Sequence, residues 1–270
     1  MAHDEQQRAR AADRWVSAGR RLSAVRAPVR QRRTGRGVPA RCGCGRPGLF
    51  RGTAGGRAVH HRRALRPGRH RLQRLAPLPR TATEVATELH ALLRGLDLDA
   101  PYVLAAHSLG GCYAHRFAQL YPGDVAGLVW LDALHPSADL AEIERTAPSV
   151  EQLRTGMREL NAELLVDYPE PVRQALSEAH LSEEWLAAGI AERTGLTGIA
   201  TELRAGPDLP DVPLIALTAS HAQTTMDAAM VAAMSRGEQR ILDGTAHHRL
   251  CFDRQDDVVL AIRDVLRWSA

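Results

Sequence analysis

Ser108 has the sequence surroundings of a serine nucleophile. It follows an apolar run that ends at Ala106, and a helical pattern begins directly after it. Small residues stand two positions before and after it, at Ala106 and Gly110, as a sharp strand-to-helix turn requires. Such a turn exposes the hydroxyl, and the Leu109 N–H at the helix N-terminus can point at a developing oxyanion. A serine that only caps an ordinary helix is the structural alternative.

A serine hydroxyl needs a base to accept its proton, and the base needs a carboxylate to orient it. His247 and His248 follow the last predicted strand, and both qualify as the base. Asp132 closes an earlier predicted strand, where it is either the orienting acid or a common turn residue. Asp227 is the rival acid, because it is the first carboxylate after the next strand. We favour Asp132 as the acid.

Alternating strand and helix patterns surround these residues. A helix is predicted from residue 81 to residue 93, with Thr81 and Glu84 as its capping box. Residues 138–205 show a run of acidic, amphipathic helical patterns. Strands are predicted over residues 101–106, 125–131, 212–218 and 239–242, and helices over residues 109–121 and 257–268. Strands that alternate with helices favour an α/β fold with a mostly parallel sheet.

Residues 81–268 resemble the later part of the α/β-hydrolase superfamily, in its bacterial carboxylesterase-like subgroup of pimeloyl-type ester hydrolases. Three stretches carry the resemblance: Ala-His-Ser-Leu-Gly-Gly over residues 106–111, and the residues of 125–136 and 247–259. The resemblance implies an α/β-hydrolase core over residues 81–270, with residues 138–205 inserted as a helical lid segment. It also implies a serine hydrolase that cleaves carboxylic esters through an acyl-enzyme, with neither metal nor organic cofactor.

The resemblance assigns the catalytic roles in the chain order nucleophile, acid, base, which gives Ser108, Asp132 and a histidine. Asp253, Arg254 and Asp256 resemble the Asp-Arg-Pro-Asp of the family, and reading back from them without a gap selects His248 as the base. His247 is the alternative. An epoxide-cleaving relative would carry aspartate in place of Ser108.

The first 80 residues do not match the family. They contain 21 arginines and three acidic residues, and no Asp or Glu occurs between Asp13 and Glu84. Residues 27–80 include three valines and no isoleucine, whereas buried strands favour β-branched residues. We therefore expect residues 1–80 to form an atypical, poorly ordered segment with no recognisable strand. The His-Gly loop that supplies a second oxyanion donor in the family is absent from the chain.

One explanation of this composition is a reading-frame error over residues 25–76, because frame-shifted GC-rich DNA encodes Arg, Gly, Ala and Pro in quantity. In that case the chain would be a catalytically impaired hydrolase-like protein. A basic arm for nucleic acid is the other interpretation, but no aromatic residues or folded motif support it, so we do not expect a nucleic-acid partner.

The remaining composition excludes several classes of protein. No apolar run approaches the roughly 18 residues of a membrane span. The four cysteines have the spacing of neither a zinc site nor a disulfide framework. We expect a cytoplasmic enzyme that acts on a small-molecule ester, and the sequence leaves its oligomeric state open.

Overall fold

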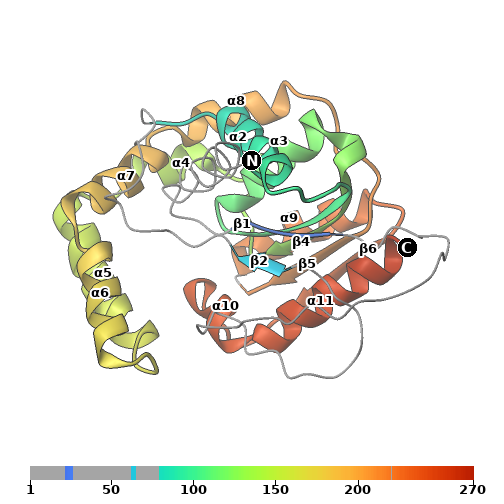
Figure 1. Ribbon diagram of the computed structural model, residues 1–270. Helices are drawn as coiled ribbons and strands as arrows, with labels where there is room; N and C mark the ends of the chain where they lie inside the picture. Colours follow the sequence, from blue (N-terminus) through green and yellow to red (C-terminus); the bar gives the residue numbers. More distant parts are fainter. Residues whose placement is uncertain (1–21, 27–61, 65–78, 220) are drawn as a thin grey trace, which may run out of the picture.

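The computed structural model describes residues 22–26, 62–64 and 79–270 except residue 220 (Figure 1). Its centre is a six-stranded sheet with the strand order β2-β1-β3-β4-β5-β6. The four strands β3–β6 run parallel to one another and confirm the predicted parallel α/β sheet. Their bounds are Tyr102–His107 for β3, Val125–Leu131 for β4, Leu214–Thr218 for β5 and Gly237–Ile241 for β6.

Two short strands precede residue 80, where the sequence predicted none. Strand β1 (Leu22–Arg26) pairs antiparallel with β3, and β2 (Arg62–Ala64) pairs antiparallel with β1. Strand pairing uses backbone N–H and C=O groups, so a short strand can form without the β-branched run that marks a buried strand. Most of the proposed frame-shifted range, residues 25–76, lies outside the described residues.

The two faces of the sheet carry two separate apolar cores. Successive strand side chains point to opposite faces, so Leu104 and Trp130 pack on one side while Val103 and Val129 pack on the other. The first face is covered by α2 (Ala82–Gly95), α3 (Gly110–Leu120), α8 (Leu196–Arg204) and α9 (His221–Ala232). The second face is covered by α11 (Gln255–Trp268). Helices on both faces bury β3, β4 and β5, as a parallel sheet requires, while the edge strand β6 is only partly buried.

The lid segment is helical, as predicted. It contains α4 (Leu140–Arg145), α5 (Val150–Leu164), α6 (Glu170–His180), α7 (Glu183–Arg193) and α8. Helix α8 contributes buried residues to the first core, whereas α6 has no buried residue. Figure 1 shows α5 and α6 beside each other, well away from α2 and α3. Leu140 of α4 also belongs to the first core, so the lid segment is anchored at both ends, while α5 and α6 lie between these anchors.

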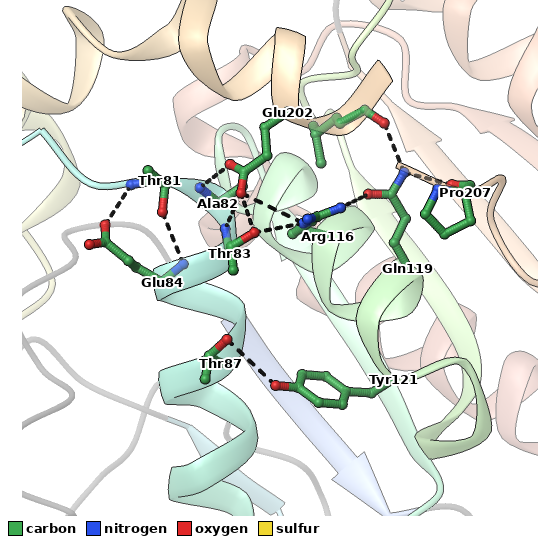
Figure 2. A network of polar contacts seen from close by, with 11 residues as sticks. Thr81, Ala82, Thr83, Glu84, Thr87, Arg116, Gln119, Tyr121, Glu202 and Pro207 are labelled. Atoms are coloured by element: carbon green, nitrogen blue, oxygen red, sulfur yellow. Dashed lines mark hydrogen bonds and ion pairs between the residues drawn. The ribbon is translucent and has the colours of Figure 1, made fainter. Parts of the chain in front are cut away.

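A polar network fastens the end of the lid segment to the core (Figure 2). Thr81 and Glu84 form the predicted capping box of α2. The Glu202 carboxylate on α8 accepts hydrogen bonds from the backbone N–H groups of Ala82 (2.8 Å) and Thr83 (3.0 Å). Arg116 of α3 donates to the Thr83 hydroxyl at 2.8 Å. Glu202 thus satisfies N–H groups that the first turn of a helix leaves without intrahelical partners.

Within the described ranges, no helix combines the length and the apolar character that crossing a bilayer would need.

Candidate active site

Ser108 sits in a strained backbone conformation between β3 and α3. Its φ of 55° lies in the left-handed region, which a serine seldom adopts. The backbone around it is held on both sides: its N–H donates to the Leu131 carbonyl (3.4 Å), and its carbonyl accepts from Gly111 (2.9 Å) and Leu134 (2.8 Å). A sharp, over-determined turn of this kind is the geometry of a nucleophilic serine.

Gly111 allows α3 to approach the end of β4. A Cβ atom at this position would lie 2.6 Å from both the Ala133 Cβ and the Leu134 carbonyl oxygen. No larger side chain fits without moving backbone. The glycine next to the turn therefore brings the residues after β4, beginning with Asp132, close to Ser108.

Asp132 follows β4 directly and is fully buried. Its φ is 47°, so it too has a left-handed backbone. The Oδ1 atom accepts a hydrogen bond from the Ala219 N–H at 3.0 Å, and Oδ2 lies 2.6 Å from His247 Nδ1. The short Asp–His contact places the imidazole proton on Nδ1, and Nε2 is then the basic atom.

The structure pairs Asp132 with His247, whereas the sequence pattern selected His248. The Nε2 atom of His248 lies 3.8 Å from the Glu163 carboxylate of α5. Both histidines belong to the 3-10 helix η3 (His247–Arg249), in which consecutive side chains point about 120° apart. Only one of them can face Asp132, so the prediction of His248 is corrected to His247 as its partner.

His107 connects the Ser108 turn to the loop of His247. Its Nε2–H donates to the His247 backbone carbonyl at 3.0 Å, and the two imidazole rings lie 4.6 Å apart. His107 directly precedes Ser108, so this contact brings the loop of His247 to the turn of Ser108. No spacing rule in the sequence links residues 107 and 247, because the contact spans 140 positions.

Asp227, the rival acid, occupies another position. It is fully buried on α9, and its Oδ2 accepts a hydrogen bond from the Thr218 hydroxyl at 2.6 Å. Burial raises the pKa of Asp227 to about 6, and the charge of Asp132 acts in the same direction, against the Thr218 hydrogen bond. Asp132 holds His247, whereas Asp227 bonds to the end of β5.

Leu109 is the N-cap residue of α3 and is fully buried. Its backbone N–H lies at the positive end of the helix, next to Ser108, where a negative oxygen would be stabilised. The His-Gly loop that supplies a second donor in the family is absent from the sequence. In the described part of the chain, no group of three His, Cys, Asp or Glu side chains has the arrangement of a metal site.

The parallel sheet, the strained serine after β3 and the Asp132–His247 pair are the features of an α/β-hydrolase fold, and comparison with solved structures agrees. Cfl2 from Burkholderia cenocepacia is 21% identical, with a TM-score of 0.53 over 69% of this chain and 72% of that one. The RedJ thioesterase of the prodiginine pathway in Streptomyces coelicolor is 19% identical, with a TM-score of 0.50 over 68% and 71%. An α/β-hydrolase fold protein from Burkholderia ambifaria is 13% identical, with a TM-score of 0.52 over 68% and 73%.

A family model for the thioesterase domain matches residues 59–236. The chain therefore belongs to the thioesterase domain family, whose members are hydrolases of the α/β-hydrolase fold. The matched range includes Ser108, Asp132 and Asp227 and ends before His247. A search of curated proteins found no matching relative.

Proposed function

We propose that this protein is a serine hydrolase that cleaves carboxylic esters or thioesters through an acyl-enzyme. The observation that carries the proposal is the 2.6 Å contact between Asp132 and His247 beside the strained turn of Ser108. An oriented imidazole beside a serine held at such a turn is an arrangement that activates a hydroxyl for attack on a carbonyl carbon.

In the proposed reaction, His247 Nε2 takes the proton of the Ser108 hydroxyl as Oγ bonds to the substrate carbonyl carbon. Asp132 stabilises the resulting imidazolium, and the Leu109 N–H donates to the tetrahedral oxyanion. The intermediate collapses as the alcohol or thiol leaves with the proton from His247. Water then attacks the acyl-enzyme, with His247 taking its proton, and Ser108 regains a proton as the carboxylic acid is released.

The proposed substrates are oxygen esters and thioesters. The matching family and the RedJ neighbour are both named as thioesterases, which supports thioesters beside oxygen esters. The same nucleophile and base serve both, since each substrate presents an acyl carbonyl and a leaving group that accepts a proton.

Epoxide cleavage is the second candidate, because the epoxide hydrolase CorEH matches with a TM-score of 0.51 at 17% identity. The serine at position 108 favours acyl transfer, because the resemblance implies aspartate at this turn in an epoxide-cleaving enzyme. Ester and thioester cleavage is therefore the function that the site supports best.

A fluorophosphonate probe tests the proposal, because it reacts with activated serines. We expect labelling of the full chain that is lost in Ser108→Ala and in His247→Gln. Hydrolysis of p-nitrophenyl esters and of acyl-coenzyme A thioesters, followed in parallel, separates the two substrate classes. A folded protein that neither labels nor hydrolyses any of these compounds would contradict the proposal.

A further inference from the structure

Asp227 is a second buried carboxyl group near the Asp132–His247 pair, and the proposed mechanism does not use it. It has no exposed surface. Its Oδ2 atom accepts from the Thr218 hydroxyl, while Oδ1 is buried with no hydrogen-bond partner among the described residues. A buried carboxyl group with an unsatisfied oxygen is destabilising by itself, so we expect Asp227 to serve a function at this position.

The backbone connects Asp227 to Asp132 through the end of β5. Thr218 is the last residue of β5, and the next residue, Ala219, donates its N–H to Asp132 Oδ1 at 3.0 Å. Gln239 of β6 donates from Nε2 to the Thr218 hydroxyl oxygen at 3.0 Å. That donation leaves the Thr218 O–H to point at Asp227, so the carboxyl group holds the strand end from which Asp132 is oriented.

Asp227 also acts on this site through charge. Asp132 and Asp227 are coupled, since the charge of Asp132 raises the pKa of Asp227. Coupling between titrating groups is reciprocal, so an ionised Asp227 adds negative potential at Asp132 and at the imidazole that Asp132 holds. Its pKa of about 6 lies in the range where a histidine exchanges its proton.

Among the side chains that the structure describes, the other titratable groups around α9 do not offset this charge. His135 contacts Met230, one turn after Asp227 on α9, and burial lowers the pKa of His135 to about 4. His115, whose ring lies 6.2 Å from that of His135, has its pKa lowered to about 4 by burial. Both are neutral above pH 5. On β6, Glu238 and Arg240 pair with each other, and Arg240 also bonds to Asp264 of α11, which covers the opposite face of the sheet.

We propose that Asp227 is a positioning residue of the active site: it holds the end of β5 against Asp132 and, when ionised, stabilises the protonated form of His247. The inference rests on the proposed function in taking His247 as the base. Since the base becomes an imidazolium in the transition state, an ionised Asp227 accelerates the reaction and moves its acidic limb to higher pH.

The test compares wild-type protein with Asp227→Asn, which removes the charge but keeps an oxygen that can accept from Thr218. The readout is the NMR titration of the His247 imidazole, assigned with His247→Gln. In Asp227→Asn we expect the midpoint of the His247 titration to be about half a pH unit lower than in wild type. The acidic limb of the kcat/KM profile should move to lower pH by the same amount, and kcat at pH 8 should fall about threefold. The matched control is Glu238→Gln, which removes a carboxylate paired with Arg240 and leaves the midpoint in place.

An unchanged His247 midpoint in Asp227→Asn would overturn the inference. The NMR titration needs no substrate, so a shifted midpoint in a protein that hydrolyses no ester or thioester supports this inference and refutes the proposed function. If the variant does not fold, the wild-type titration decides the matter. Ionisation of Asp227 should make the His247 curve biphasic, and a single-step curve counts against the proposal.

Discussion

His247 Nδ1 lies 2.6 Å from Asp132 Oδ2, while the adjacent His248 turns away toward Glu163 on the lid segment. The Asp132 carboxylate is fully buried and the His247 side chain is 40% exposed. The acid is thereby shielded from water, while the imidazole extends from it toward solvent, where substrate can arrive. This relationship distinguishes two histidines that the sequence leaves nearly equivalent.

The two histidines should therefore respond differently to the same substitution. His247→Gln removes the proposed base, so kcat should fall by about a hundredfold to ten-thousandfold on the best ester or thioester substrate. His248→Gln removes only a surface contact and should leave kcat within about threefold, since exposed ion pairs contribute little. Steady-state kinetics of both variants give the comparison, and the reverse order of effects would restore His248 as the base.

Gly111 should tolerate no side chain, because a Cβ atom there meets Ala133 and Leu134 at 2.6 Å. Gly111→Ala is expected to lower the free energy of unfolding by about 1–3 kcal/mol, the typical result of overpacking. Gly156, in α5, is the control, because a Cβ atom added there would have no neighbour within 4 Å. Gly156→Ala should raise stability by about 0.5–1 kcal/mol, because alanine favours the helix. Urea unfolding measures both, and equal effects would refute the close approach of α3 to β4.

Asp227 should make stability depend on pH. Its pKa rises from 3.8 to about 6 on folding, so the folded state favours the protonated carboxyl group. This contribution is fully present below pH 3.8 and is lost as the pH rises through about 6. Asp227→Asn should therefore be more stable than wild type at pH 8 by about 2–3 kcal/mol and nearly equal to it at about pH 4. Unfolding measured across this range tests the sign, and a difference independent of pH would exclude it.

Glu202 should hold the lid segment to the core. Its carboxylate accepts from the N–H groups of Ala82 and Thr83, so Glu202→Ala leaves helix α2 without these caps. The expected loss is about 1–2 kcal/mol, with faster hydrogen exchange in the first turn of α2. Glu159→Ala, at an exposed position on α5, is the matched control and should change neither measurement. Unaltered exchange at α2 in Glu202→Ala would show that the network in Figure 2 does not stabilise the lid segment.

Much of the fold could be predicted from local patterns. The capping box of Thr81 and Glu84, the strand before Ser108 and the helix after it all follow from short-range preferences, and the structure has all of them. Strands β1 and β2 could not be predicted, because their pairing depends on the backbone of β3, which no local composition reveals.

The candidate site was predicted less completely. Ser108 and Asp132 could be placed because each follows a recognisable strand, and the carboxyl ends of parallel strands meet at one edge. The sequence could not show which of His247 and His248 is the base, because this depends on which residue of the 3-10 helix η3 faces Asp132. The contacts of His107 with His247 and of Asp227 with Thr218 could not be predicted from the sequence either, because each contact joins two separate elements.

The amino-acid sequence alone indicated the class of protein, the order of strands β3–β6, and Ser108 and Asp132 as candidate site residues. Periodicity and small residues at a turn are local properties, so they can be read along the chain. Only the tertiary structure decided that His247 meets Asp132 and that Asp227 lies behind them. Those choices depend on the packing of β4, β5, α9 and η3, in which residues up to 115 positions apart come within hydrogen-bonding distance.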